Sequence, residues 1–374
     1  MTATRLSEIC RLISGQHIDS ANYNTACRGI GYLTGPSDFG PRFPIVSKWT
    51  EYPKVTANRG DILVTVKGSG VGKTNLLDQD NIAISRQLMA VRVTAADPQY
   101  VQSFLEFKFE HFQDVSTGAA IPGISRDQLL SLEVPLPELP EQQRIVAILD
   151  EAFAAIANAK ANAEKNLQNA RALFDSYLAS CFSVWHDTWP KESIGSVCEY
   201  SNGKAHEMHI DEGGQFILIN SKFISSDGQV FKRTSAPLSL LRIGDVAMVL
   251  SDVPNGKALA KCYLVESNET YSLNQRICSF RSKVLIPRFL YWQLNRHPYL
   301  LNFDNGENQT NLRLNQVLSC PLVVPPLHVQ QSLADTLDSI AEKVEALKGI
   351  FEGKLVALDE LKKSLLHRAF NGDL

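Results

Sequence analysis

The second half of the sequence repeats the first half at a spacing of 188 residues. This spacing superposes identical residues near both ends of each half: Cys10 on Cys198, Gly15 on Gly203, Gln142-Gln143 on Gln330-Gln331, Leu149-Asp150 on Leu337-Asp338, and Phe182 on Phe370. A chain of 374 residues that contains two copies of one unit is a duplicated protein with an approximate internal two-fold symmetry. We therefore expect it to perform one task at two places.

The composition predicts a folded protein without a membrane segment. Hydrophobic residues make up 44% of the chain, which is enough to bury the cores of two or three domains. No apolar run approaches the roughly 20 residues that a membrane-spanning helix needs, and residues 1–10 do not resemble a signal peptide. We therefore expect a cytoplasmic protein.

The net charge does not by itself predict a nucleic-acid-binding protein. The formal net charge is −3. Residues 1–139 contain 13 Lys and Arg against 14 Asp and Glu, and residues 186–326 contain 14 against 13. Nucleic-acid-binding domains usually carry a clear basic excess, whereas each of these segments is within one charge of neutral.

Each copy ends in a long amphipathic helix. Residues 141–182 contain no Pro or Gly, and apolar residues recur there at every third or fourth position. After Pro325-Pro326 a second stretch carries apolar residues in near-heptad spacing up to the C-terminus. Two such stripes can cover each other, and an antiparallel coiled coil keeps the internal two-fold.

The segment before each helix has mixed character. Residues 62–66 and 246–250 are apolar strands, each preceded by Gly-Asp, and short aromatic helices follow Pro98 and Pro287. The predicted fold class is therefore α+β, with two similar globular domains separated by two long antiparallel helices in a pseudo-two-fold repeat. The expected boundaries are residues 1–140 for the first domain, 141–184 for the central helix, 185–327 for the second domain and 328–374 for the C-terminal helix.

Several motifs resemble catalytic or metal sites without completing them. Residues 68–74 resemble a phosphate-binding loop, but Lys67 occupies the position of its first glycine. Asp97-Pro98-Gln99-Tyr100 lacks the second proline of the amino-methyltransferase motif, and no Gly-rich cofactor loop precedes it. His206 and His209 have no apparent third ligand. We therefore expect no catalytic residues and no metal site.

Two sequence signatures resemble a known family. The first is the run from Pro135 to Gln143, in which Pro-Leu-Pro precedes Glu-Gln-Gln at the start of the long helix. The second is the C-terminal run from Lys363 to Leu374, with Ala-Phe-Asn-Gly near its end. Together with the duplicated arrangement, these signatures resemble the DNA-specificity subunit of type I restriction–modification systems over the whole chain.

This resemblance implies a noncatalytic, sequence-specific DNA-binding subunit. Each globular domain would be a target-recognition domain that reads one half of a split double-stranded DNA target. The helices would hold the two halves apart and dock methyltransferase subunits and a motor–endonuclease subunit. The chain itself would need no cofactor, because S-adenosylmethionine and ATP would be bound by those partner subunits.

Candidate contact residues follow from the chemistry of DNA, because cations bind phosphates and amide or hydroxyl side chains bind base edges. The candidates for DNA contact are Gln16, His17, Tyr32, Thr34, Arg42, Lys67, Ser69, Lys73, Thr74 and Thr117 in the first copy, and Lys204, His206, Lys222, Asn255, Lys257, Lys261, Asn308 and Gln309 in the second. The candidates for partner contact are Glu141, Gln142, Gln143, Gln330 and Gln331.

Two other classes of function stay open at this level. One is an enzyme, a nucleotide hydrolase or methyltransferase whose motifs have drifted. The other is a structural adaptor that binds proteins through its two globular domains.

Overall fold

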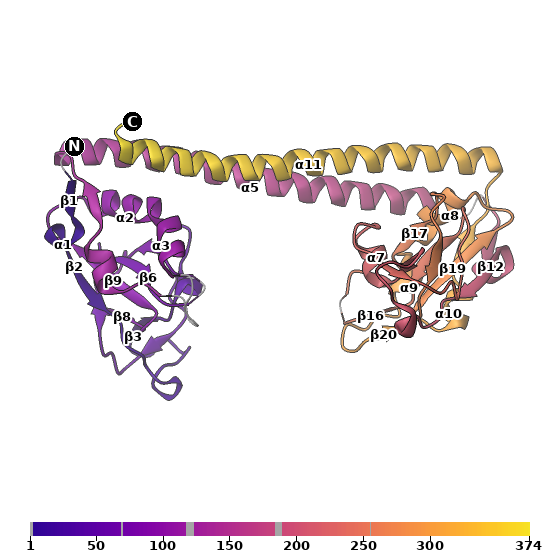
Figure 1. Cartoon of the computed structure of the whole chain (residues 1–374), viewed down its shortest axis with the longest axis horizontal. Helices are drawn as coiled ribbons and strands as arrows, with labels where there is room; N and C mark the ends of the chain where they lie inside the picture. The colour runs from indigo at the N-terminus through magenta and orange to yellow at the C-terminus, as the bar shows by residue number, and fades with distance from the viewer. Residues whose placement is uncertain (1–2, 69, 117–122, 184–188, 255) are drawn as a thin grey trace. The chain divides into compact units, whose positions relative to one another are not determined.

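The chain divides into two compact units, each with one mixed domain and one half of each long helix (Figure 1). The computed structural model describes residues 3–68, 70–116, 123–183, 189–254 and 256–374. Unit 1 comprises Met1–Lys165 and Phe351–Leu374, and unit 2 comprises Asn166–Ile350. The unit boundaries fall inside the helices, whereas the boundaries expected from the sequence make each helix a separate segment.

The elements of the first copy run in the following order. They are β1 (Ala3–Arg5), α1 (Leu6–Ile9), β2 (Cys10–Ser14), η1 (Ser20–Asn22), β3 (Ile30–Leu33), η2 (Pro36–Asp38), β4 (Trp49–Thr50), β5 (Thr56–Ala57), β6 (Ile62–Thr65), β7 (Thr74–Leu76), β8 (Ile82–Ile84), β9 (Leu88–Val93), α2 (Pro98–Phe107), α3 (Phe109–Ser116), α4 (Arg126–Leu130), β10 (Glu133–Pro135) and α5 (Leu139–Ser183).

The second copy follows the same plan. Its elements are β11 (Lys191–Ser193), α6 (Ile194–Val197), β12 (Cys198–Asn202), η3 (Glu207–His209), β13 (Phe216–Ile219), α7 (Ser221–Ser225), β14 (Lys232–Thr234), β15 (Val246–Val249), β16 (Ser251–Asp252), β17 (Cys262–Leu264), β18 (Tyr271–Leu273), β19 (Ile277–Ser282), α8 (Pro287–Leu294), α9 (Pro298–Leu301), β20 (Thr310–Asn311), α10 (Leu314–Leu318), β21 (Pro321–Val323) and α11 (Leu327–Asn371).

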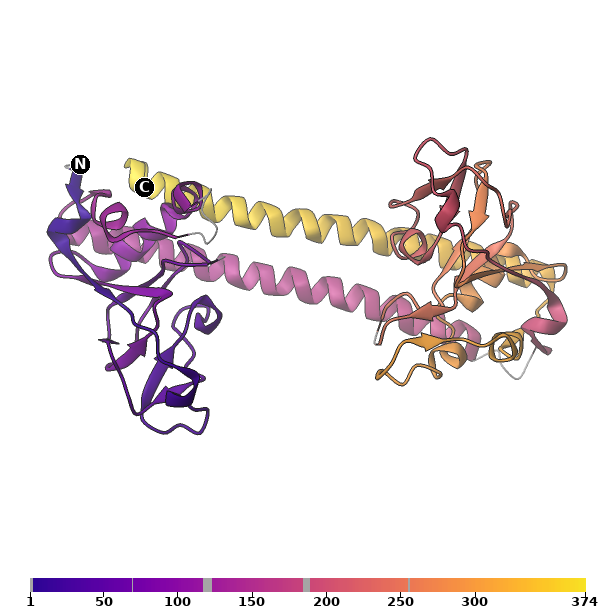
Figure 2. The ribbon, with the colours of Figure 1, turned by 60° about the horizontal axis from the view of Figure 1, so that its bottom comes forward.

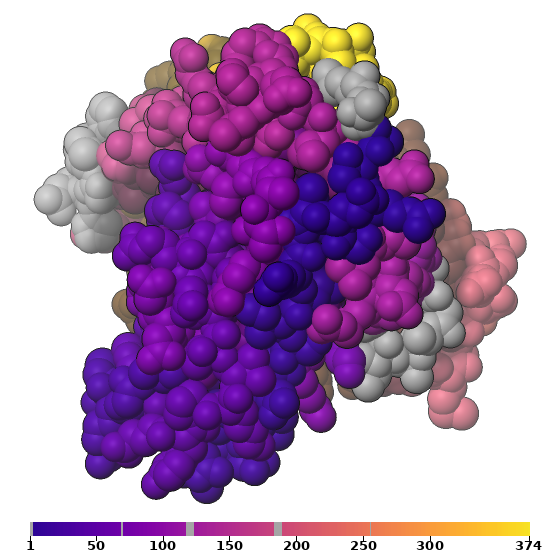
Figure 3. All heavy atoms as spheres, turned by 90° about the vertical axis from the view of Figure 1, so that its left-hand side faces the viewer, coloured from indigo at the N-terminus to yellow at the C-terminus, as the bar shows by residue number. Residues whose placement is uncertain are grey.

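The main sheets of the two units have the same strand order. In unit 1 it is β2-β9-β6-β7, and in unit 2 it is β12-β19-β15-β17. A second sheet contains a parallel pair in both units, β3 with β8 and β13 with β18. The chain start is paired with the strand before the long helix, as β1 with β10 and β11 with β21. Figure 3 shows the N-terminal residues, in indigo, at the surface of unit 1.

The repeat is confirmed, but its register contains compensating insertions. Elements at both ends of a copy keep the spacing of 188, such as β2 with β12 and α5 with α11. In between, β6 and β15 lie 184 residues apart and β9 and β19 lie 189 apart. The gapless register that the sequence indicates therefore holds only at the ends, because loops absorb length changes without disturbing the strands.

Alternating side chains bury both faces of the main sheet. On β6, Ile62 and Val64 join a core that also contains Ile145 of α5 and Phe370 of α11, whereas Leu63 points to a second core shared with the other sheet. Unit 2 repeats this division: Val246 and Met248 face the helices, and Ala247 and Val249 face the second sheet. The period of two in a strand places successive residues on opposite faces, which explains why these predicted strands are apolar throughout.

The two Gly-Asp dipeptides have the same structural role. Gly60 and Gly244 adopt positive φ values of 84° and 88°, which glycine tolerates without steric cost. The aspartate that follows accepts hydrogen bonds from an arginine on the neighbouring strand: Arg92 donates to Asp61 at 2.8 and 2.7 Å, and Arg281 donates to Asp245 at 2.7 Å. Each pair ties the start of a central strand to its neighbour.

Both predicted long helices are present. The first spans Leu139–Ser183 and the second Leu327–Asn371, within two residues of the predicted starts. Within unit 1 the halves run antiparallel, because Arg144 donates to the carbonyl of Leu374 and Lys160 pairs with Asp359 (Figure 2). Phe370 fastens α11 to the mixed domain through Tyr100 and Phe104, with ring centroids 5.2 and 5.4 Å apart.

Candidate nucleic-acid interface

In each unit a glycine allows the loop after the first strand of the main sheet to contact a distant turn. A Cβ atom on Gly15 would lie 2.1 Å from the carbonyl oxygen of Ser85, and one on Gly203 would lie 1.9 Å from that of Asn274. Both distances are far below a van der Waals contact, so only glycine permits this approach. The turn between β8 and β9 is thereby held against the loop that follows β2, and the turn between β18 and β19 against the loop that follows β12.

Backbone hydrogen bonds connect four loop segments of unit 1 into one surface. Gln16 donates to the carbonyl of Ile84 at 3.0 Å, and Val66 donates to Gln87 at 2.8 Å. Ile124 then donates to Val66 at 2.9 Å. We call this surface rim 1, which consists of residues 15–17, 66–68, 70–73, 85–87 and 123–124.

Unit 2 builds the same surface with equivalent bonds. Lys204 donates to the carbonyl of Leu273 at 3.1 Å, and Leu250 donates to Arg276 at 2.8 Å. Leu312 donates to Leu250 at 2.8 Å, and β16 pairs with β20 beside it. We call this surface rim 2, which consists of residues 203–206, 250–254, 256–257, 274–276 and 308–312. Segments far apart in sequence therefore meet in the same order in both units.

The rims contain many of the predicted DNA-contact residues. The exposed ones are Gln16, His17, Lys67 and Lys73 on rim 1 and Lys204, Lys257, Asn308 and Gln309 on rim 2. Gln309 also donates to the hydroxyl of Ser251 at 2.8 Å, which fixes its position on the rim. Ser69, Thr117 and Asn255 lie outside the described residues. The role of all these side chains in DNA contact stays a prediction.

Tyr32, Thr34 and Thr74 point into the domain, so the prediction of surface contact is corrected for them. Tyr32 is 2% exposed, its hydroxyl accepts a hydrogen bond from the backbone of Ile18 at 3.3 Å, and burial raises its pKa. Thr34 is half-buried and donates to Asp38 at 2.8 Å. The hydroxyl of Thr74 is buried in the domain.

His206 is fully buried and supports rim 2 from inside. Its Nδ1 lies 2.7 Å from the carbonyl oxygen of Lys204, and its Nε2 lies 2.8 Å from the hydroxyl of Ser272. A carbonyl only accepts, so this network assigns the hydrogen to Nδ1. The prediction of DNA contact by His206 is therefore corrected: the imidazole holds the Lys204 backbone in place and does not reach the surface.

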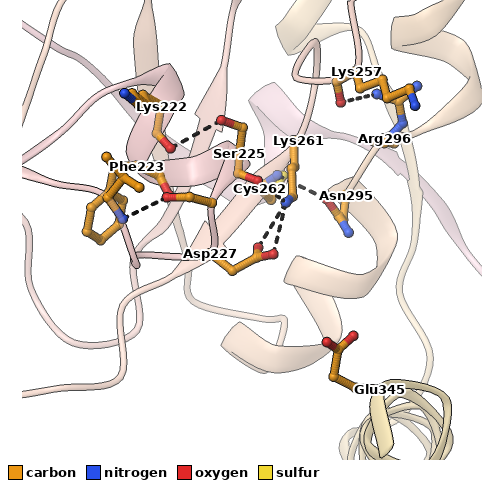
Figure 4. A network of polar contacts seen from close by, with 12 residues as sticks. Lys222, Phe223, Ser225, Asp227, Lys257, Lys261, Cys262, Asn295, Arg296 and Glu345 are labelled. Atoms are coloured by element: carbon orange, nitrogen blue, oxygen red, sulfur yellow. Dashed lines mark hydrogen bonds and ion pairs between the residues drawn. The ribbon is translucent and has the colours of Figure 1, made fainter. Parts of the chain in front are cut away.

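Three predicted cations lie away from the rims. Arg42 is 3.6 Å from Asp150 of α5. Lys222 is exposed on α7, and Lys261 beside it donates to Asp227 at 3.1 Å and to the carbonyl of Ser225 at 3.2 Å (Figure 4). Lys261 therefore caps the C-terminal end of α7, and its ammonium group is less available to bind a phosphate.

Two of the predicted partner contacts are internal fasteners. Gln142 is 3% exposed; its Oε1 accepts from the backbone of Asp97 at 2.9 Å and its Nε2 donates to Pro137 at 2.8 Å. Gln330 is 1% exposed and makes the equivalent bonds, from the backbone of Ile286 and to Pro325, both at 2.8 Å. The prediction of partner contact is corrected for both glutamines, because each amide joins its long helix to the adjacent domain.

The other helix candidates remain accessible. Gln143 and Gln331 are exposed. Glu141 is half-buried and accepts hydrogen bonds from Arg144, which lower its pKa. Their contact with a partner subunit stays a prediction.

The structure adds four rim residues that the sequence analysis did not select. Arg86 and Gln87 on rim 1, and Gln275 and Arg276 on rim 2, are exposed at the tips of equivalent turns. Arg276 has a φ of +67°, in the left-handed region that a side chain rarely adopts. The detectable signal was a polar dipeptide between two apolar strands at the same place in both copies.

The motifs rejected from the sequence are not completed by the structure. Thr74 begins strand β7, whereas a phosphate-binding loop opens a helix. Among the described residues, no group of three His, Cys, Asp or Glu side chains could hold a metal ion. No helix in the described part of the chain is long and apolar enough to cross a membrane.

Two α+β units with one strand order, each presenting an exposed polar rim, define a duplicated binding protein. The family model described as the type I restriction modification DNA specificity domain matches residues 3–167 and again residues 186–352. The chain belongs to this family. It is a DNA-specificity protein of the type I restriction–modification class, as its signatures predict.

Curated relatives agree with this assignment. The MjaVIII specificity subunit of Methanocaldococcus jannaschii is 21% identical over 347 residues, covering 86% of this chain and 80% of the relative. The StySPI specificity subunit of Salmonella potsdam is 21% identical over 307 residues, covering 74% of this chain and 65% of the relative.

The solved structures show the same fold. A chain from a study of complex assembly and conformational transition of the type I R-M system has a TM-score of 0.82 at 19% identity, covering 100% of this chain and 98% of its own length. The HsdS subunit of Thermoanaerobacter tengcongensis has a TM-score of 0.60 at 20% identity, covering 100% of this chain and 97% of its own length.

Proposed function

We propose that the chain is the sequence-reading subunit of a type I restriction–modification complex, with rim 1 and rim 2 each reading one half of a bipartite target. The observation that carries this proposal is that one backbone arrangement of four loop segments is built twice and carries different side chains each time. One scaffold with two sets of side chains is suited to reading two different sequences.

The charges on the rims fit this role. Among the described residues, Lys67 and Arg86 on rim 1 and Lys204 and Arg276 on rim 2 are exposed and make no ion pair. Cations of this kind bind phosphates, and arginine also binds guanine with two hydrogen bonds. The small net charge of the chain, −3, is compatible with DNA binding, because only one face of each unit needs a local positive potential.

We further propose that the chain has no catalysis of its own. Methyltransferase subunits would bind S-adenosylmethionine, and a motor–endonuclease subunit would bind ATP. Glu141, Gln143 and Gln331 are candidate contacts for these partners, because they are the accessible members of the helix-start signatures. The paired helices would act as the spacer between the two readers.

Mapping methylated bases tests the proposal. The chain is expressed with its methyltransferase, in wild-type form and with Lys67→Ala and Arg86→Ala together, or Lys204→Ala and Arg276→Ala together. Each double variant should relax or abolish recognition of one half-site, and the identity of the affected half should differ between them. Lys283→Ala is the matched control, because Lys283 follows the other end of β19 from rim 2.

Two results would contradict this function. If both double variants alter the same half-site, the two units do not read independently. If the wild-type assembly shows no salt-dependent retention on DNA, the adaptor function would replace it, because phosphate contacts always make binding salt-dependent.

A further inference from the structure

Unit 1 contains a cavity of about 890 Å³ between its mixed domain and the C-terminal half of α11. This volume lies in the range of about 300–1,000 Å³ that is typical of small-molecule sites. Four segments surround it: the loop at residues 36–41, the end of rim 1 with strand β7, helices α2 and α3, and residues 359–367 of α11. The cavity adjoins rim 1, because Gly72 and Lys73 belong to both.

Strand β7 brings unsatisfied polar atoms to this cavity. Asn75 lines it and is 4% exposed; its amide nitrogen donates to the carbonyl of Gly40 at 2.9 Å. The Oδ1 atom of Asn75 and the hydroxyl of Thr74 are buried and have no hydrogen-bond partner among the described residues. Buried polar atoms without partners are rare in folded proteins, and a bound ligand is one way of satisfying them.

The charged lining leaves one cation unpaired. Lys362 of α11 pairs with Glu106 at 2.8 Å, and Lys363 pairs with Glu110 at 3.0 Å. Asp359 is paired with Lys160 of α5. Among the described lining residues, Lys73 is exposed and makes no ion pair. Glu360 shares Lys363 with Glu110, at 3.6 Å, so each of the four lining carboxylates has a lysine partner. Lys73 is the lining cation left to bind an anionic group of a ligand.

Aromatic side chains supply the apolar part of the lining. Phe39, Phe107 and Phe109 all line the cavity. The ring of Phe107 is stacked on that of Phe370, with centroids 5.5 Å apart and an angle of 24° between the planes. Fixed aromatic surfaces of this kind bind planar rings by stacking.

The second copy closes the equivalent place with its own side chains. Strand register equates Lys73 with Lys261, since Thr65 donates to the Lys73 carbonyl as Val249 does to that of Lys261. Lys261 is bound to Asp227, and Asn295 accepts from the backbone of Cys262 at 3.0 Å (Figure 4).

At the position of Asn75 the second copy has an aromatic residue. The registers Leu63 with Asn75 and Ala247 with Tyr263 make these two positions equivalent. The ring of Tyr263 packs on Phe223 with centroids 4.8 Å apart. The lysine and the polar strand residue that stay unsatisfied in unit 1 are therefore a feature of that copy and not a consequence of the shared scaffold.

We propose that the unit 1 cavity binds a mononucleotide: a planar base against the aromatic lining, an N–H donor toward Asn75 Oδ1, and a phosphate at Lys73. A small shift of neighbouring side chains would open the shielded Asn75 oxygen to the base. The nucleotide has two possible sources, a free nucleotide in solution or a nucleotide displaced from bound DNA. This inference goes beyond the proposed DNA reading, which does not require the cavity.

Calorimetric titration of the full chain with AMP, GMP, CMP and dTMP tests the proposal, with inorganic phosphate as the ligand without a base. At least one mononucleotide should bind with a Kd of about 1 mM or tighter. Lys73→Gln should weaken binding about tenfold, the loss expected for one charge-assisted hydrogen bond. Lys354→Gln is the matched control, because Lys354 is exposed on α11 outside the cavity and should leave the Kd unchanged.

A second variant acts from the opposite wall. Ser364→Trp places a large side chain in the cavity from α11 and should abolish binding, while thermal melting verifies that the chain stays folded. Absence of binding by every nucleotide, or binding that neither variant weakens, would overturn the proposal. DNA retention is measured on the same samples, so failure here is distinguishable from failure of the proposed function.

Competition with duplex DNA separates the two sources. If the cavity takes a displaced nucleotide, saturating duplex should prevent mononucleotide binding to the wild-type chain. If it takes a free nucleotide, the Kd should be the same with and without duplex. Either outcome supports the cavity as a nucleotide site and assigns its source.

Discussion

The two units differ where the chain meets solvent and agree where backbone groups must be satisfied. The pairs Asp61–Arg92 and Asp245–Arg281, and the fasteners Gln142 and Gln330, make the same bonds in both copies. The rims share backbone bonds but carry Arg86-Gln87 in one copy and Gln275-Arg276 in the other. Duplication has thus preserved the groups that hold the scaffold and left the exposed ones open to change.

The largest expected effect comes from the glycines below the rims. Gly203→Ala should destabilise unit 2 by about 3 kcal/mol or more, because the new Cβ would lie 1.9 Å from a backbone oxygen that cannot move alone. Gly15→Ala should do the same to unit 1. Hydrogen exchange of peptides from each unit measures both effects. Gly353→Ala is the control, because a Cβ atom added there on α11 has no other atom within 4 Å, and the change should be neutral or stabilising. Equal protection from hydrogen exchange in all three variants would show that Gly15 and Gly203 do not have this role.

Loss of a glutamine fastener should have the next largest effect. Gln330→Ala leaves the backbone N–H of Ile286 and the carbonyl of Pro325 buried without their partner, which should cost about 2–3 kcal/mol. Gln142→Ala should destabilise unit 1 by a similar amount. Urea unfolding measures the change, with exposed Gln331→Ala as the control. A much smaller effect in one unit would show that the two fasteners are not equivalent.

A pH dependence should distinguish unit 2 from unit 1. Burial lowers the pKa of His297 from 6.5 to about 4, and its Nδ1 accepts from the backbone of Tyr299 at 3.2 Å. Between these pH values the unfolded chain binds more protons than the folded one. Stability should therefore fall as the pH drops from 6.5 toward 4, by about 2 kcal/mol.

His297→Asn provides the matched variant for this pH dependence. Asparagine keeps a helix cap but does not titrate. Urea midpoints at pH 7 and pH 5 should differ less in the variant than in the wild type. Equal differences would assign the acid sensitivity to other groups.

The smallest effect on stability, and a specific one on recognition, is expected from the turns. Exchanging the two residues in unit 2, with Gln275→Arg and Arg276→Gln, keeps the charge. The free energy of unfolding should stay within about 0.5 kcal/mol of the wild-type value. Base preference in one half-site should change, by about 1–3 kcal/mol per altered contact. Methylation mapping reports it, and the other half-site is the internal control. An unchanged target would exclude the turn from base reading.

The sequence alone determined the features that depend on local periodicity and on repetition. The two long helices, the Gly-Asp strands and the duplicated α+β plan follow from apolar spacing and from identical residues 188 apart. These patterns are set by neighbours within a few turns or strands, so they can be read without knowing the fold.

Only the tertiary structure decided which polar residues face solvent and which loops meet. His206 and Gln142 look like surface residues in the sequence, but the fold buries them because distant backbone groups need their hydrogen bonds. Arg86 joins Gln16 and Lys67 on one surface through bonds between segments far apart in the chain. The satisfaction of buried backbone groups is a property of the whole domain, and no local pattern encodes which side chain will provide it.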